Sequence, residues 1–259
     1  MIYSVGMASK ASSAPAASAA QDVAATLEPI AQLRAHEYVA EQLRRQIGLR
    51  MVLPEEGLPS ERELSGLFGV GRATVQAAIR LLEAERLVET RRGRNGGTFV
   101  LAHDEDDLAQ DYLMARLRRE RDRIGEALVF RRNVETFAAG LAATQHSAAE
   151  LELMRAAQDA AAAAQSDAEF IANDTQFHLA IARAAHNAFV YEALEHMRLV
   201  LNDAISALPE TRTPQRRAIK EHAAILAEIE GRDGAAAATA IDRHAATTER
   251  DINAMLAGL

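Results

Sequence analysis

The chain has 259 residues, of which 49% are hydrophobic, and a formal net charge of −8 at pH 7. It contains no cysteine, which excludes disulfides and thiolate ligands and leaves His, Asp and Glu as the residues able to hold a metal ion. No apolar run approaches the length of a membrane span, and the chain is long enough for two domains with separate cores.

Residues 1–29 are rich in Ala and Ser and show no apolar period, which predicts a disordered tail. They have neither the basic leader nor the compact apolar core of a signal peptide. Together with the lack of cysteine, this favours a cytoplasmic protein. Residues 30–101 follow as the first folded unit, which opens with a helix whose apolar face is formed by Val39, Leu43 and Ile47.

A helix-turn-helix is predicted over residues 58–82. Ser60 and Glu63 have the spacing of a capping box at the start of its first helix. The segment 69–71, Gly-Val-Gly, supplies the turn, because glycine accepts positive φ angles. The second helix starts near Arg72. Its buried face is formed by Val75, Ile79 and Leu82, and its other face carries Arg72, Thr74, Gln76 and Arg80.

Two short strands are predicted after this motif, over residues 87–89 and 98–100, with the Arg- and Gly-rich segment 91–97 as the turn between them. They complete a winged helix-turn-helix. The alternative, an ordinary helical hairpin within a bundle, does not account for this wing.

The charge is divided unevenly between the two halves. Residues 30–101 hold 11 Lys and Arg against 9 Asp and Glu, a net charge of +2, whereas residues 102–259 hold 17 against 26, a net charge of −9. The mildly basic front half favours phosphate contacts through the wing tip and Arg72.

The second half is predicted to be entirely helical. Residues 102–121 form a charged hinge and a connecting helix, and residues 122–259 form an antiparallel bundle, so that the half contains six or seven helices. The basic segment 116–123 is interleaved with acidic residues and is interpreted as a solvated helix face. The fold class is therefore mainly α, with an N-terminal winged helix-turn-helix and a C-terminal all-α bundle.

Polar residues interrupt the apolar stripes of three bundle helices. Asp174 and His178 share a face with Phe170 and Phe177, and two further histidines lie on buried faces downstream. These four groups are costly to bury unless they are paired or coordinated. We expect a divalent metal ion, with zinc favoured over nickel or manganese, held by Asp174, His178, His222 and His244.

The competing interpretation is that each histidine is a hydrogen-bonded core residue, which is the common case for a single buried imidazole. Four such groups on three helices make it less attractive here. The other histidines, His36, His103, His146, His186 and His196, are interpreted as surface or cap residues.

At these residues the chain resembles a known family. The segments LPSEREL, GVGRATVQAAIRLLEAERLV and RRGRNGGTFV are similar to the DNA-binding domain of the GntR family of bacterial transcription regulators. The second half resembles the FadR-type effector domain, called the FCD domain, with the four predicted ligands at its metal motif. The resemblance covers residue 30 to the end.

The resemblance implies contacts with a double-stranded DNA operator by a set of residues in the helix-turn-helix and the wing: Ser60, Arg62, Arg72, Thr74, Gln76, Arg92, Arg94, Gly96 and Gly97. The sequence departs from the family pattern at two positions. Gly71 replaces the usual Ser, which removes a helix cap. Gln76 replaces a common Arg, so that a guanidinium able to bind guanine through two hydrogen bonds is exchanged for an amide suited to adenine. An unusual operator is therefore expected.

The resemblance also implies a small organic acid as effector, bound beside the metal, with Arg131 holding its carboxylate. The alternative for Arg131 is a surface ion pair. The chain is predicted to be a homodimeric, ligand-responsive repressor of a palindromic operator and not an enzyme. Two rivals stay open, a metal-sensing regulator and a metal-dependent hydrolase or isomerase. For the enzyme, the sequence offers no clear general base near the ligands and leaves only Glu135 open.

Overall fold

The computed structural model describes residues 34–93, 96–101, 107–208 and 212–259. Side chains are described from residue 113 in the helix that begins at Asp107, and from Pro214 in the helix that begins at Arg212. The predicted disordered tail and Arg94 lie outside the described residues, as does most of the predicted charged hinge.

The N-terminal unit contains the helices α2 (Ala35–Gly48), α3 (Glu61–Phe68) and α4 (Arg72–Ala84). The apolar faces predicted for α2 and α4 both contribute to one buried core, which confirms the periodicity argument. The core residues of these two faces are Val39, Leu43, Ile47, Val75, Ile79 and Leu82.

The turn between α3 and α4 follows the local chemistry of the sequence. Ser60 and Glu63 form the predicted capping box. Gly69 ends α3 with a φ of 64°, a left-handed conformation that glycine adopts without a Cβ penalty. Gly71, by contrast, has a φ of −69° and provides no side-chain cap for α4, as expected for a position that lacks a hydroxyl.

The wing is a two-stranded antiparallel sheet of β1 (Val88–Arg91) and β2 (Gly97–Val100), in which Val88 pairs with Val100 and Thr90 with Thr98. Both strands were predicted, although each differs by a residue or two from the predicted bounds. Gly96 shapes the turn between them, because a Cβ there would lie 2.5 Å from the carbonyl oxygen of Arg91.

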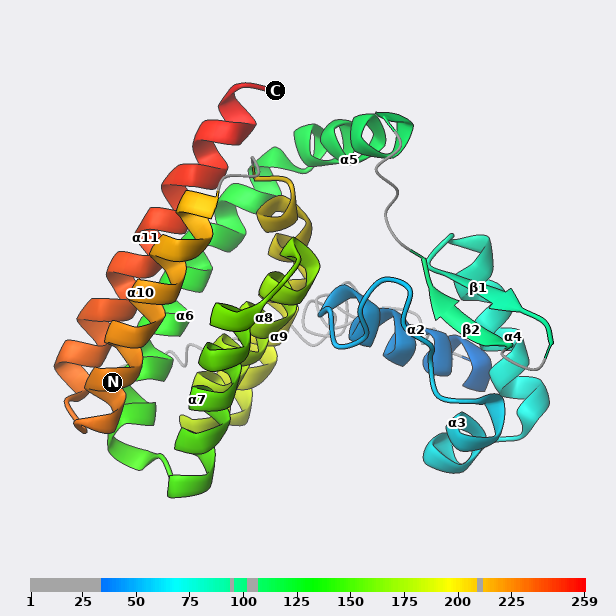
Figure 1. Cartoon of the computed structure of the whole chain (residues 1–259), viewed down its shortest axis with the longest axis horizontal. Helices are drawn as coiled ribbons and strands as arrows, with labels where there is room; N and C mark the ends of the chain where they lie inside the picture. The colour runs from blue at the N-terminus through cyan, green and yellow to red at the C-terminus, as the bar shows by residue number, and fades with distance from the viewer. Residues whose placement is uncertain (1–33, 94–95, 102–106, 209–211) are drawn as a thin grey trace, which may run out of the picture. The chain divides into compact units, whose positions relative to one another are not determined.

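The C-terminal unit consists of helices within the part of the chain that the structure describes. Their bounds are α5 (Asp107–Arg119), α6 (Arg121–Gln145), α7 (Ala148–Ala163), α8 (Asp167–Ala184), α9 (Ala188–Ser206), α10 (Arg212–Glu230) and α11 (Gly234–Ala257). Figure 1 shows α6 to α11 lying side by side as a bundle, in which α6 packs against α11 and α7 against α8.

One detail of this half differs from the prediction. The basic segment 116–123 is not one helix face, because α5 ends at Arg119 and α6 begins at Arg121. Pro214 lies in the first turn of α10, where proline is tolerated.

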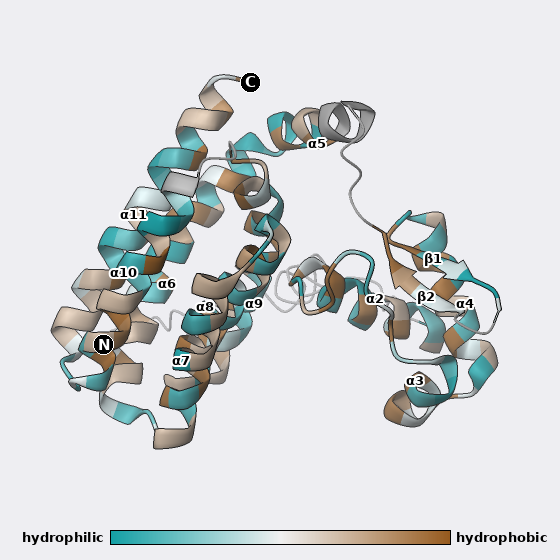
Figure 2. Cartoon of the chain, in the orientation of Figure 1, coloured by the Kyte–Doolittle hydropathy of each residue, from teal (hydrophilic) through white to brown (hydrophobic). Residues whose placement is uncertain are grey.

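Small residues set the spacing of the bundle. Gly140 on α6 and Gly234 on α11 face each other so closely that a Cβ on Gly234 would lie 2.9 Å from the carbonyl oxygen of Gly140. In Figure 2, hydrophobic and hydrophilic residues alternate along α10 and α11, as in helices with one buried face. Among the described helices, none is both long and apolar enough to cross a membrane.

Candidate functional site

The four predicted metal ligands meet in the bundle core. Asp174 and His178 lie one turn apart on α8, His222 lies on α10 and His244 on α11, and all four are buried. One ligand atom from each of the four lies within 4.8 Å of the others. The bundle therefore brings together residues that the sequence places on three different helices.

The distances within this cluster fit a metal ion. Nε2 of His222 lies 3.4 Å from Nε2 of His244 and 3.4 Å from Oδ1 of Asp174. Nε2 of His178 lies 3.9 Å from the same oxygen and has no hydrogen-bond partner among the described residues. Ligands held about 2.0–2.1 Å from a tetrahedral ion are roughly 3.3 Å apart, so these groups are spaced as ligands are.

The protonation states also suit a metal. Burial lowers the pKa of His178 to about 4, and burial together with the neighbouring His244 holds the pKa of His222 well below its ordinary value. Burial alone would raise the pKa of Asp174, but the interaction with Arg198 and the smaller ones with His178, His222 and His244 together outweigh it, and the pKa falls below its usual range. The cluster thus presents an ionised carboxylate beside two neutral imidazoles, the forms that bind metal ions.

Two carboxylates orient two of the histidines. Oε1 of Glu135, on α6, lies 2.9 Å from Nδ1 of His178, and Oε2 of Glu221, on α10, is hydrogen-bonded to Nδ1 of His244 at 2.8 Å. A carboxylate at Nδ1 favours the tautomer whose Nε2 lone pair is free for a metal. Glu135 therefore supports a ligand in the folded protein.

Arg131 is 2% exposed, so the interpretation as a surface ion pair is wrong. Its Nε donates to Oε1 of Glu135 at 2.9 Å, but its Nη1 has no hydrogen-bond partner among the described residues. Arg198 on α9 is also fully buried, and its Nη2 lies 2.8 Å from Oδ2 of Asp174. An unpaired buried donor is costly, which makes Arg131 a suitable anchor for an anion.

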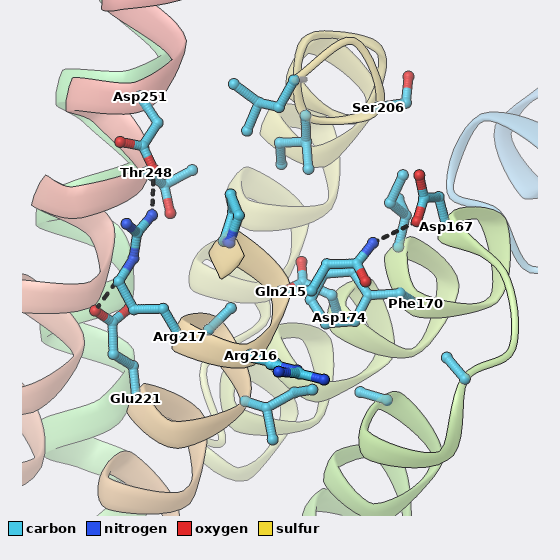
Figure 3. A pocket seen from close by; sticks show the side chains of 18 of the residues that line it. Asp167, Phe170, Asp174, Ser206, Gln215, Arg216, Arg217, Glu221, Thr248 and Asp251 are labelled. Atoms are coloured by element: carbon cyan, nitrogen blue, oxygen red, sulfur yellow. Dashed lines mark hydrogen bonds and ion pairs between the residues drawn. The ribbon is translucent and has the colours of Figure 1, made fainter. Parts of the chain in front are cut away.

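A cavity of about 650 Å³ lies beside the cluster. Arg131, Asp174 and His244 contribute to its wall, and Figure 3 shows Asp174 between the side chains of α10 and α8 that also line it. The Ala-rich run at residues 160–164 supplies three of the lining residues, at positions 161, 162 and 164.

Four of the remaining histidines can be located. His146 is the C-cap of α6 and its Nδ1 lies 2.8 Å from the carbonyl oxygen of Ala142, which agrees with a cap, although the side chain is buried. His186 is exposed and pairs with Glu150, His196 is exposed and His36 is partly buried. None of these four belongs to the metal cluster. His103 lies outside the described residues.

The exposed face of α4 carries the residues predicted to contact DNA. Arg72 and Gln76 are exposed and lie one turn apart, and Thr74 is partly buried. Nε2 of Gln76 donates to Oε2 of Glu61 at 2.8 Å, a contact between α4 and α3 that the sequence did not reveal. Arg62 is exposed on α3. The hydroxyl of Ser60 is used in the capping box.

On the wing, Arg92, Gly96 and Gly97 are exposed. Arg91, which was not predicted as a contact, is held against the sheet, because its guanidinium lies 4.7 Å from the ring centroid of Phe99 and its Nη2 lies 2.9 Å from Oε2 of Glu55. The exposed Arg92 is therefore the better candidate for a phosphate contact.

Comparison with known families places both halves of the chain. Residues 35–100 match the family described as "Bacterial regulatory proteins, gntR family", and residues 126–247 match the "FCD domain". The chain belongs to the GntR family. The FCD match contains all four residues of the buried His and Asp cluster, which confirms the resemblance seen in the sequence.

Several curated regulators are similar to this GntR-family chain. It is 28% identical over 205 residues to the HTH-type transcriptional regulator LutR of Bacillus subtilis (76% of this chain, 91% of the relative). It is 29% identical over 231 residues to the HTH-type transcriptional repressor NanR of Cronobacter sakazakii (83% and 84%). It is 35% identical over 144 residues to the Uxu operon transcriptional regulator of Escherichia coli (54% of each).

Among solved structures, E. coli McbR/YncC matches with a TM-score of 0.50 and 17% identity, covering 88% of this chain and 99% of that one, which supports the fold. The family matches and the relatives are transcription regulators and not enzymes. The GntR-family chain is therefore a DNA-binding, ligand-responsive transcription regulator, and the hydrolase or isomerase alternative is not supported.

Sequence reasoning missed some residues that complete the site. Arg198, which pairs with Asp174, and Glu221, which orients His244, were not singled out, and Glu135 was considered only as a general base. Their signals were present but weak: Glu221 directly precedes His222, and Glu135 follows Arg131 by one helical turn.

Proposed function

We propose that the chain is a cytoplasmic, homodimeric repressor that binds a palindromic operator and releases it when a small carboxylate binds beside a metal ion in the FCD domain. The printed name of the NanR relative, a transcriptional repressor, supports this output, and that of the Uxu operon regulator supports control of an operon. Arg72, Thr74, Gln76 and Arg92 are the proposed DNA contacts.

The observation that carries the effector proposal is the cavity that reaches both the metal cluster and Arg131. The unpartnered Nη1 of Arg131 supplies a donor for an anion. Charge balance points the same way. The buried Arg131 and Arg198 are offset by the buried Glu135 and Asp174. A divalent ion adds two positive charges to this neutral set, and an anionic effector reduces them.

The resident ion is proposed to be zinc, since three imidazoles and one carboxylate at tetrahedral spacing suit it, with nickel or manganese as alternatives. A bound ion would supply a Lewis-acidic anchor for the effector carboxylate. Asp174, His178, His222 and His244 would hold it. Elemental analysis of protein purified without added metal tests this. Unchanged metal content in both His178→Ala and His222→Ala would refute the assignment.

The alternative regulator, a metal sensor, is less well supported, because sensing an ion alone needs no cavity of about 650 Å³ beside the ligands. Measuring which addition releases the operator, metal or organic acid, distinguishes the metal sensor from the effector proposal. If the operator is released on adding or removing metal, with no response to any organic acid, the sensor is correct and the effector proposal is wrong.

An exposed apolar face on α6 supports the homodimer. Val129, Phe130 and Phe137 are 56%, 53% and 55% exposed and lie on one face of this helix. A two-fold contact between two such faces would bury them and match a palindromic operator. Phe137→Asp is expected to shift the protein from dimer to monomer in light scattering, whereas Phe189→Asp, an exposed residue of α9, is the control. A Phe137→Asp protein that stays dimeric would rule out this face.

The central experiment uses the full-length, metal-loaded protein and the operator it selects from random DNA. Small carboxylates are added one at a time, and DNA release and thermal shift are followed together, since a ligand that binds only the folded state raises the melting temperature. Arg131→Lys keeps the positive charge but removes the paired N–H donors of the guanidinium. It is expected to weaken effector binding while metal content stays the same. Release by no acid would count against the proposal.

A further inference from the structure

The cavity is larger than its metal-binding end requires. Its volume of about 650 Å³ lies within the range of roughly 300–1,000 Å³ that is typical of pockets for drug-sized ligands. Arg131 and the metal cluster occupy one part of the wall, and residues of α7 to α11 form the remainder, where apolar side chains alternate with hydroxyl and charged groups. A three-carbon acid bound at the metal would leave much of this space to water.

The hydroxyl groups on the wall are acceptors for a ligand. The Oγ1 of Thr247 donates to the carbonyl oxygen of Arg243 at 3.0 Å, and the Oγ1 of Thr248 to that of His244 at 3.3 Å. Ser206 donates to Asp203 in the same way, at 2.9 Å. A hydroxyl has one proton to donate and two lone pairs. Oγ1 of Thr247 also accepts from Nη2 of Arg250 at 3.3 Å. With the protons used by the backbone, one lone pair on Thr247 and both on Thr248 and Ser206 remain for donors on the ligand.

Carboxylates add to these acceptors on both sides of the cavity. Figure 3 shows Asp251 and Glu221 on one side, joined by Arg217, and Asp167 on the other, joined to Gln215. With Arg216 also on the wall, two arginines face three carboxylates. This part of the wall therefore carries a formal charge of −1, which disfavours a second carboxylate on the ligand.

An apolar ligand is disfavoured for a different reason. An alkyl chain lying against Thr247, Thr248 and the carboxylates would displace water from acceptors without replacing its hydrogen bonds, which carries the penalty of unpaired polar groups. A ligand that carries one carboxylate and several hydroxyl donors satisfies both ends of the cavity.

We propose that the effector is a polyhydroxylated monocarboxylic acid of about six carbons, an aldonic or uronic acid, rather than a short hydroxy acid, a dicarboxylic acid or a fatty acid. This rests on the proposed function, because it places the carboxylate at the metal and Arg131. The hydroxyls then donate to Thr247, Thr248 and the flanking carboxylates.

The test is calorimetric binding to the full-length, zinc-loaded protein. The sugar acids are D-gluconate, D-galactonate, D-glucuronate and D-galacturonate, and the comparison acids are adipate, hexanoate and L-lactate. At least one sugar acid is expected to bind at least about 10-fold more tightly than all three comparison acids, as two or more added hydrogen bonds would give. If a comparison acid binds as tightly as the best sugar acid, this inference is overturned and the proposed function stands. Binding by none of the seven overturns this inference, and the wider screen of small carboxylates then decides the proposed function.

Matched variants on α11 test the hydroxyl argument. Thr248→Val keeps the shape but removes the acceptor, and is expected to weaken the best sugar acid about 5- to 10-fold while leaving metal content unchanged. Thr248→Ser is expected to restore binding. Thr239→Val is the control, because Thr239 makes the same backbone bond, to Ala235 at 2.8 Å, away from the cavity. Unchanged affinity in both Thr248→Val and Thr247→Val would overturn the proposed contacts.

Discussion

Oε1 of Glu135 lies 2.9 Å from Nδ1 of His178, and the same oxygen accepts a hydrogen bond from Nε of Arg131 at 2.9 Å. One buried carboxylate oxygen thus joins a proposed metal ligand to the proposed effector anchor. Burial opposes its ionisation, but Arg131, His178 and Arg198 together outweigh it and hold the pKa of Glu135 well below the usual range. A change at Glu135 is therefore expected to affect both sites.

The first prediction concerns metal affinity. Glu135→Gln removes the charge that orients His178 and is expected to weaken metal binding by about 10- to 100-fold, as the loss of such outer partners does elsewhere. Competition with a chromogenic chelator measures the change. Glu230→Gln, an exposed glutamate on α10, is the matched control and is expected to bind metal as the unmodified protein does. Equal affinities in the two variants would contradict the orienting role.

The second prediction concerns metal removal. If ion and effector offset each other's charge, each raises the affinity for the other by the same factor. Dialysis against a chelator is expected to weaken effector binding by at least about 10-fold, within the usual coupling range of roughly 1–3 kcal/mol, and re-addition of zinc is expected to restore it. Calorimetry on the two forms gives the factor. An effector that binds both forms equally would show that the ion is not part of its site.

The third prediction concerns DNA. Arg72→Ala removes an exposed cation from the first turn of α4 and is expected to weaken specific operator binding by about 1–3 kcal/mol. Fluorescence anisotropy at several salt concentrations measures both affinity and salt dependence. Metal content and thermal melting are expected to be unchanged. Arg155→Ala, on α7 of the bundle, is the control. Operator affinity equal to that of the control would remove Arg72 from the interface.

The fourth prediction concerns the capping box at the start of α7. Hydrogen bonds from the backbone N–H and hydroxyl of Ser147, with a smaller effect of His186, lower the pKa of Glu150 to about 2. Because the folded pKa is lowered, the ionised group stabilises the protein above the ordinary pKa of about 4.3, and this contribution is lost as pH falls towards 2. Ser147→Ala is expected to cost about 1 kcal/mol at pH 7, with a smaller difference at pH 3.

Urea unfolding at pH 7, 5, 4 and 3 measures that difference. The control is Ser147→Ala in a Glu150→Gln background, where no carboxylate titrates and the cost is expected to be independent of pH. If the stability lost through Ser147→Ala in the protein that keeps Glu150 does not become smaller as pH falls, the hydrogen bond between Ser147 and the Glu150 carboxylate contributes little to stability.

The helix-turn-helix could be predicted because its determinants are local. The capping box of Ser60 and Glu63 and the glycine at position 69 act within a few residues of one another. The inward direction of the four metal ligands was also predictable, since it follows from helical periodicity. That α8, α10 and α11 meet at one point was not, because periodicity fixes the buried face of a helix but not its neighbour.

The pairing of Arg198 with Asp174 could not be predicted for the same reason. Arg198 and Asp174 are 24 positions apart, and no local pattern pairs them. Gln76 and Glu61 lie on different helices, so their hydrogen bond depends on how α3 crosses α4. The cavity is a property of the assembled bundle. Its lining comes from segments that are far apart in sequence and includes alanines that carry no chemical signal.

The three histidines of the cluster are held unequally. His178 and His244 each have a carboxylate oxygen within 2.9 Å of Nδ1, whereas Nδ1 of His222 has no such carboxylate among the described residues and its ring stacks on Phe177. Rotation of the His222 ring breaks no hydrogen bond at Nδ1. The rate at which the protein exchanges its ion is therefore expected to depend on Phe177. The affinity for the ion is expected to depend on Glu135 and Glu221.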